Sequence, residues 1–335
     1  MKSQAPFKIA LTLARRLFGL ILAVGTLTSV GASGDGWLTN FEEAKKQAAA
    51  ENKDLLLGFT GSDWCPPCMA LDQEVFSQKA FLTATKDKLV LVELDFPQDK
   101  ELDAETTGQN SALQEEYKIE GYPTVMLCDA TGKPYAQTGY QAGGAEKYAA
   151  HLIELQAIRV KRDAAFAKVE KAKDNAEKAA ALVEGLQMIE EDLIDSHYSD
   201  VSEHIKQLDP EDKTGFAKIR KAAMAKKEAE SALNRFVDVT LIPMIEGREF
   251  AKALTATKTF LKENPELSEE SRESILLGVG LAGPLEEGDL KAAHAVIDQL
   301  AKEYPDGGIA KDIDSLKSGV ADEIKQMKEA EEETE

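Results

Sequence analysis

Two cysteines separated by two residues are the part of this chain best suited to chemistry. Cys65 and Cys68 lie in a Trp-Cys-Pro-Pro-Cys run at residues 64–68. Thiols at this spacing can open and close a disulfide with almost no backbone movement. The apolar residues 54–59 predict a buried strand before the run, and residues 69–74 continue it with a helical pattern. The sequence therefore predicts a redox-active dithiol where a strand leads into a helix.

A helix N-terminus favours a reactive thiol, because its unpaired N–H groups and its dipole stabilise a thiolate. We expect Cys65, the more N-terminal and more exposed thiol, to be the nucleophile, with a pKa below the free value of about 8.5. Cys68, one turn further on, is then the resolving thiol. Pro66 takes a first-turn position where a missing N–H costs nothing, and Pro66 and Pro67 both restrict the reduced loop.

Two other readings of the cysteine pair stay open. A zinc site needs two more ligands. The only other cysteine is Cys128, and none of the four histidines forms a paired ligand motif near it. A purely structural disulfide between Cys65 and Cys68 would close a very small loop and stabilise little. The sequence indicates no metal and no cofactor besides the redox-active disulfide.

Residues on both sides of the dithiol complete a larger pattern. Gly-Tyr-Pro-Thr stands at residues 121–124, before an apolar strand at 125–127, and Gly-Ser-Asp-Trp-Cys at 61–65 leads into the dithiol, with Glu-Val-Phe after it at 74–76. This pattern resembles the thioredoxin superfamily, and within it thioredoxin-like proteins of the bacterial envelope related to the C-terminal domain of the membrane thiol:disulfide interchange reductase. The resemblance covers about residues 37–155.

The resemblance implies the roles of several site residues. It implies a cis bond between Tyr122 and Pro123, with Pro123 facing the dithiol and the backbone of Tyr122 able to pair with an extended substrate. On general grounds alone a trans bond would be expected. The residues that the resemblance places at the bound substrate are Trp64, Pro66, Pro67 and Tyr122.

One acidic residue is a candidate proton acceptor. Thioredoxins usually carry a buried acid in the strand before the dithiol, whereas this chain has Gly-Phe at residues 58–59. Glu93 interrupts the apolar strand 89–95, so a half-buried Glu93 carboxylate could take the proton of Cys68. The alternative is that Glu93 or Asp95 only ends the strand in solvent.

Segment 96–108 and Cys128 each allow two interpretations, one structural and one functional. The polar, acidic segment 96–108 is a loop that shapes partner choice or a solvated insertion. Cys128 lies in an apolar strand and is expected to be a small buried hydrophobic residue, with redox sensing as the alternative.

The N-terminus predicts export. Four basic residues precede an apolar stretch at 17–30 that ends in small residues, as in a cleaved signal peptide over residues 1–32. The stretch is short for a membrane span, although an uncleaved membrane anchor is the alternative. We therefore expect a periplasmic protein. The basic residues are Lys2, Lys8, Arg15 and Arg16.

The charge excludes several classes of partner. The 335 residues carry a formal charge of −20, and without the four basic residues of the signal 36 positive charges face 60 negative ones, which gives −24. Such a chain is unsuited to bind nucleic acid or anionic lipid.

The segment after the signal predicts an α/β thioredoxin fold, a mixed sheet flanked by helices, over residues 33–158. The expected elements are a short strand at 37–38, a helix at 41–51 capped by Thr39 or Asn40, a strand from 54, a helix from a Ser77 cap to 86, a strand at 89–95, a helix at 111–118, a hairpin of 125–128 with 135–140, and a helix from 145.

Residues 159–328 predict an all-helical domain, followed by a solvated acidic tail at 329–335. A 40-residue spacing relates residues 250, 253, 260 and 265 to 290, 293, 300 and 305. The spacing weakly resembles tetratricopeptide-type helical hairpins, with an irregular helical bundle as the alternative. Such an array would bind a protein or mediate self-association.

Together these observations predict an exported thiol:disulfide oxidoreductase that reduces or isomerises protein disulfides through Cys65 and Cys68. Its partners would be disulfide-containing or dithiol envelope proteins and a membrane-bound or soluble thiol electron donor. The alternative function is an interaction protein, in which the helical domain binds a partner and the thioredoxin domain is a recognition element.

Overall fold

The computed structural model describes residues 36–332, so the predicted signal peptide at residues 1–32 lies outside the described part. The described residues form two compact units, one ending at Lys218 and the other beginning at Ile219. Among the described residues, no helix combines the length and apolar character needed to cross a membrane.

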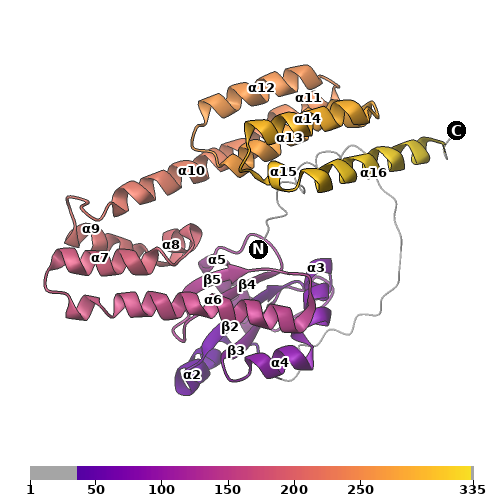
Figure 1. Ribbon diagram of the computed structural model, residues 1–335. Helices are drawn as coiled ribbons and strands as arrows, with labels where there is room; N and C mark the ends of the chain where they lie inside the picture. The colour runs from indigo at the N-terminus through magenta and orange to yellow at the C-terminus, as the bar shows by residue number, and fades with distance from the viewer. Residues whose placement is uncertain (1–35, 333–335) are drawn as a thin grey trace. The chain divides into compact units, whose positions relative to one another are not determined.

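A five-stranded mixed sheet forms the centre of the first unit (Figure 1). Its strands are β1 (Trp37–Leu38), β2 (Asp54–Thr60), β3 (Leu89–Asp95), β4 (Thr124–Cys128) and β5 (Pro134–Thr138). The order across the sheet is β1-β3-β2-β4-β5, with β1, β3 and β2 parallel and β4 and β5 antiparallel to their neighbours. The Leu- and Val-rich strands β2, β3 and β4 are buried along nearly their whole length, as apolar runs predict. The sheet confirms the predicted fold class.

Helices flank the sheet. In chain order they are α2 (Phe41–Glu51), α3 (Pro66–Leu71), the π-helical turn η1 (Asp72–Phe76), α4 (Lys79–Thr85), α5 (Ala104–Glu116) and α6 (Gly144–Phe166). Helix α2 has the predicted bounds, because Asn40 caps it by accepting a hydrogen bond from the N–H of Glu43. Helix α6 packs against α4 and β5.

Two predicted helix starts are wrong. Helix α4 begins after Gln78, because the Ser77 hydroxyl instead donates to the carbonyl oxygen of Asp72. Helix α5 begins at Ala104 rather than at residue 111, because Asp103 caps it by accepting from the N–H of Thr106. The last five residues of the predicted loop 96–108, residues 104–108, are therefore helical.

The helices after residue 158 share the core of the sheet. Helix α6 continues to Phe166, and η2 (Val169–Lys171), α7 (Asn175–Leu186), α8 (Glu191–His197) and α9 (Ser199–Leu208) follow it. Leu186 and Tyr198 belong to the same buried cluster as strands β2 to β4. Helix α7 lies beside α6 (Figure 1), where a Cβ atom on Gly185 would come within 2.3 Å of the Phe166 ring.

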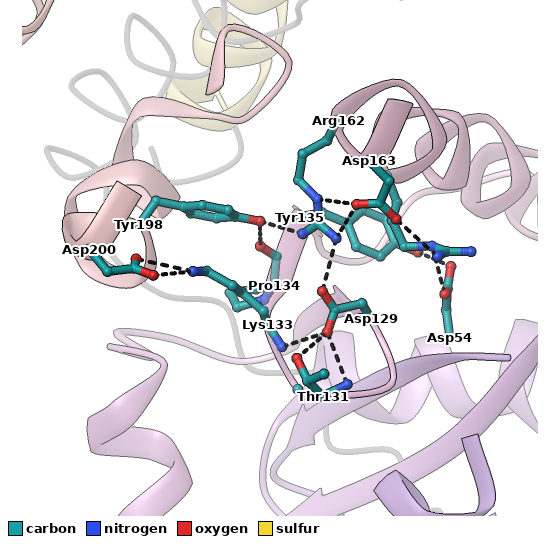
Figure 2. A network of polar contacts seen from close by, with 12 residues as sticks. Asp54, Asp129, Thr131, Lys133, Pro134, Tyr135, Arg162, Asp163, Tyr198 and Asp200 are labelled. Carbon is teal, nitrogen blue, oxygen red and sulfur yellow. Dashed lines mark hydrogen bonds and ion pairs between the residues drawn. The ribbon is translucent and has the colours of Figure 1, made fainter. Parts of the chain in front are cut away.

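A polar network joins the β4–β5 hairpin to helix α6 and to Tyr198, the residue between α8 and α9 (Figure 2). Arg162 donates to the Tyr198 hydroxyl at 2.6 Å and to the Asp129 carboxylate at 2.9 Å. The fully buried Tyr198 in turn donates to the carbonyl oxygen of Pro134 at 2.7 Å. These contacts connect α6 and the junction of α8 and α9 to the sheet.

The second unit is helical throughout. Its elements are α10 (Phe216–Phe236, which begins just before the unit boundary), η3 (Val237–Leu241), α11 (Ile242–Glu246), α12 (Phe250–Glu263), α13 (Glu269–Glu286), α14 (Leu290–Glu303), α15 (Gly308–Lys311) and α16 (Ile313–Glu332). Helices α12 and α14 begin 40 residues apart and both have 14 residues. Helix α16 continues through the first part of the predicted acidic tail.

Candidate active site

The dithiol lies at the junction of β2 and α3. A turn at residues 61–64 leaves the sheet. Cys65 occupies the N-cap position of α3 without a capping side-chain hydrogen bond, and its N–H donates to the carbonyl oxygen of Gly61 at 3.0 Å. Cys65 and Cys68 form a disulfide with a Cα–Cα distance of 5.2 Å. The structure thus places the pair between a buried strand and a helix, as the sequence predicts.

The surroundings of Cys65 differ from two expectations. Both cysteines are buried in the disulfide form, with exposed fractions of 3% for Cys65 and 2% for Cys68, so Cys65 is hardly the more exposed. Pro66 and Pro67 fill the first two helical positions and have no N–H. The first N–H groups of the helix, those of Cys68 and Met69, donate to the Cys65 carbonyl oxygen. Stabilisation of a Cys65 thiolate, as the sequence predicts, would therefore depend on the helix dipole more than on free N–H donors.

An exposed apolar surface surrounds the buried disulfide. The exposed fraction is 37% for Trp64 and 39% for Met69, and Pro66 and Pro67 are also exposed. The Trp64 ring packs edge-on against the partly buried Tyr122, with 5.7 Å between ring centroids. The predicted substrate-contacting residues are therefore gathered beside the cysteines.

A small cavity of about 30 Å³ lies behind Cys68. Pro123 lines it, and the Tyr122–Pro123 bond is cis, as the resemblance implies. Its wall also includes Glu93, which lies opposite Gly58 in the register of β3 and β2. The structure therefore brings Cys68, Pro123 and Glu93 to one cavity, with Glu93 on the strand beside Gly58, where the resemblance leads one to expect a buried acid.

Asp72 lines the same cavity and is a candidate that the sequence reasoning missed. Burial raises the pKa of the Asp72 carboxyl above its ordinary value. Its spacing of four residues from Cys68 could have revealed it, because residues four apart share a helix face. The cavity thus holds two carboxylates, from Asp72 and Glu93, together with Cys68.

Asp95 does not end its strand in solvent, which corrects one of the readings left open. Its side chain is buried and accepts hydrogen bonds from the N–H of Ser62 at 2.9 Å and the Ser62 hydroxyl at 2.7 Å. Lys100 forms an ion pair with it at 3.0 Å. Asp95 therefore holds the turn that precedes Cys65.

Cys128 is fully buried in β4, which confirms the expected burial. Burial raises the pKa of the Cys128 thiol well above its ordinary value. Since thiolates rather than thiols react with oxidants and disulfides, this environment is unsuited to redox sensing.

Comparison with known proteins agrees with this geometry. A family model for the thioredoxin-like domain matches residues 41–156. The disulfide bond reductase DsbH of Chlamydia pneumoniae is 32% identical over 120 residues, which are 36% of this chain and 72% of DsbH. The thioredoxin-related protein DsbJ of the same organism is 31% identical over 91 residues, but these cover only 26% of DsbJ and 27% of this chain.

Two solved structures are also similar. A DsbH oxidoreductase structure has 30% sequence identity and a TM-score of 0.35, covering 42% of this chain and 96% of that one. The oxidised C-terminal domain of Neisseria meningitidis DsbD has 18% identity and a TM-score of 0.25, covering 34% of this chain and 90% of that domain. Because the match to the DsbH sequence exceeds two thirds of that protein's length, the chain belongs to the thioredoxin-like family.

Proposed function

We propose that this protein is a thiol:disulfide oxidoreductase that reduces or isomerises disulfides in other proteins. The observation that carries the proposal is the Cys65–Cys68 pair at the strand–helix junction, with Cys68 facing a cavity lined by Asp72 and Glu93. A structural disulfide needs neither an apolar docking surface on one side nor proton-accepting groups on the other.

The reaction begins with the reduced dithiol. The Cys65 thiolate attacks one sulfur of the substrate disulfide, forms a mixed disulfide and releases the other substrate sulfur as a thiolate. The Cys68 thiol then loses its proton to a cavity carboxylate, for which we propose Glu93 with Asp72 beside it. The Cys68 thiolate attacks Cys65 Sγ, which closes the protein disulfide and releases the fully reduced substrate. A thiol donor must supply the two electrons for the next cycle.

Substrate docking follows from the exposed apolar residues. Trp64, Pro66, Pro67 and Tyr122 offer a surface for the chain on either side of a substrate disulfide. Pro123 follows Tyr122 and lines the cavity with Cys68, where it would limit the approach of the mixed disulfide.

The direction and the place of the reaction are also proposals. The name of DsbH describes a disulfide bond reductase, which supports reduction rather than oxidation as the direction. The basic and apolar N-terminus supports export to the periplasm. The substrates would then be envelope proteins, and the electron donor a membrane-bound or soluble thiol protein. The second unit would bind a protein partner.

Reduction of insulin with dithiothreitol as electron donor tests the proposal. The wild-type protein should accelerate the reaction, and Cys65→Ser should abolish the acceleration. Cys128→Ala is the matched control, because it removes a buried thiol away from the site and should keep the activity. An inactive wild-type protein that still binds an envelope partner would favour the interaction-protein alternative.

A further inference from the structure

The turn that carries the dithiol is attached to the segment that follows β3. The N–H of Phe96 donates to the carbonyl oxygen of Thr60 at 2.8 Å, and Ser62 donates twice to the carboxylate of Asp95. Residues 60–64 and 95–99 are thus held side by side along their length. We call the second of these segments, residues 95–99, the flanking segment.

Asp63 makes the outermost of these attachments. Its carboxylate accepts a hydrogen bond from the N–H of Gln98 at 2.9 Å and from the N–H of Asp99 at 2.8 Å. Although burial acts in the opposite direction, these two N–H groups hold the pKa of Asp63 below its ordinary value. The carboxylate is therefore ionised at neutral pH and makes charge-assisted hydrogen bonds, which are stronger than neutral ones.

The flanking segment in turn holds Trp64. The indole N–H of Trp64 donates to the carbonyl oxygen of Phe96 at 2.8 Å. The centroid of the Phe96 ring lies 5.2 Å from that of the Tyr122 ring, which in turn contacts the Trp64 ring edge-on. Under the indole, Gly61 leaves no spare room, since a Cβ atom there would lie 2.5 Å from the Trp64 ring. Even so, 37% of Trp64 remains exposed.

We propose that Asp63 is a positioning residue for the docking of protein substrates. Its carboxylate fixes the backbone at Gln98 and Asp99, which keeps the carbonyl oxygen of Phe96 in place to hold Trp64 beside Cys65. The inference rests on the proposed function, because it assumes that the surface around Trp64 receives a substrate.

This placement predicts a selective effect. The hydrogen bonds of Asp63 go to the flanking segment, and the cavity behind Cys68 is lined by other residues. Loss of the Asp63 carboxylate should therefore weaken the docking of a protein disulfide and leave the reaction of the dithiol with a small disulfide unchanged.

The test compares Asp63→Asn with Asp99→Asn. Both substitutions remove one negative charge from the same region, but the exposed Asp99 contributes its backbone N–H, which Asp99→Asn retains. For a protein disulfide substrate, Asp63→Asn should raise KM about tenfold, as expected for the loss of hydrogen bonds to a charged group, with kcat nearly unchanged. Asp99→Asn should leave KM unchanged, and both variants should react with oxidised glutathione at the wild-type rate.

Tryptophan fluorescence tests the same inference without an activity measurement. The sequence has two tryptophans, so Trp64 is the only one left in a Trp37→Phe background. In that background Asp63→Asn should shift the emission to longer wavelength and increase quenching by acrylamide, whereas Asp99→Asn should do neither.

Two results would overturn the inference. One is that Asp63→Asn and Asp99→Asn give the same KM and the same quenching. The other is that Asp63→Asn slows the reaction with oxidised glutathione as much as the reaction with protein, which would place its effect on the dithiol itself. If the wild-type protein reduces no protein disulfide, the proposed function fails, and the fluorescence comparison still decides whether Asp63 positions Trp64.

Discussion

Polar groups lie near both ends of strand β2, and their surroundings differ. At its start, the buried Asp54 carboxylate has three partners, the Tyr135 hydroxyl at 2.8 Å, the Gln156 amide at 3.0 Å and the Arg159 guanidinium at 2.8 Å. Beyond its other end, Asp72 lines a cavity with Cys68, and burial raises its pKa.

The difference separates polar groups that hold the fold from those that can move a proton. The partners of Asp54 come from β5 and α6, so its contacts hold these two elements to the start of β2. A carboxylate whose pKa is raised by burial exchanges protons more readily near neutral pH. One strand thus connects a structural end, marked by Asp54, with a reactive end, marked by the dithiol.

The largest effects are expected from the two cysteines, since they define the reactive end. Cys68→Ala should trap substrates as mixed disulfides, because Cys65 can still attack but nothing resolves the product. Cys65→Ala should trap none. Non-reducing electrophoresis after incubation with a protein disulfide measures both, and trapping by Cys65→Ala would reverse the assignment.

At the structural end, loss of Arg162 should reduce stability without reducing activity. Arg162→Met leaves the buried Tyr198 hydroxyl and the Asp129 carboxylate without their guanidinium, which should cost about 3 kcal/mol. Urea unfolding measures the loss, and insulin reduction per folded molecule should match the wild type.

Lys133→Met is the control for that substitution. It removes the more exposed ion pair between Lys133 and Asp200 in the same region (Figure 2), which should cost about 1 kcal/mol or less. Equal losses of stability for Arg162→Met and Lys133→Met would contradict the assigned role of the buried network.

The cavity carboxylates should control resolution of the mixed disulfide. Glu93→Gln keeps the shape and removes the charge, so resolution by Cys68 should slow by about tenfold or more, while attack by Cys65 is little changed. Asp72 accepts a proton only when it is ionised, so its contribution beside Glu93 should be lost as the pH drops through its raised pKa, and Asp72→Asn should weaken this pH dependence of the resolution rate. Stopped-flow measurement of both steps between about pH 5 and 9 tests this. If each variant gives a pH profile that superimposes on that of the wild type, the cavity carboxylates do not accept the proton of Cys68.

Asp72 also predicts a dependence of stability on pH. Its folded-state pKa lies above its unfolded value, so the ionised form costs stability once the pH rises through the folded pKa. Asp72→Asn should therefore be more stable than the wild type at neutral pH, and the difference should vanish below the unfolded pKa of about 3.9. A difference in stability that does not change with pH would show that burial of the charge is not its cause.

A smaller effect is expected from Pro123. Pro123→Ala should keep the fold and slow turnover severalfold, with longer-lived mixed disulfides, because Pro123 lines the cavity beside Cys68. Circular dichroism and the decay of a trapped mixed disulfide measure the two parts. Unchanged decay would remove Pro123 from the site.

Local sequence patterns were enough to predict the dithiol and several of the elements around it. The spacing of Cys65 and Cys68, the apolar run of β2 and the Asn40 cap of α2 depend on neighbouring residues, and the structure places these elements as predicted. The α5 start was missed because Asp103 was not recognised as its cap.

The structural end could not be predicted in the same way. The partners of Asp54 lie 81 and 102 residues away, at Tyr135 and Gln156, and Arg162 meets Tyr198 across 36 residues. No local pattern encodes such contacts, because they form only after the sheet and α6 have packed. The placement of Asp72 in the Cys68 cavity likewise depends on the sheet that closes the cavity.

The reduction potential of the Cys65–Cys68 pair tests the central proposal most directly. It can be measured by equilibration in dithiothreitol or glutathione buffers, with the alkylated dithiol quantified by mass spectrometry. A protein disulfide reductase should have a value near that of thioredoxin, about −270 mV. A value near about −120 mV would instead indicate an oxidant and contradict the proposed direction of electron flow.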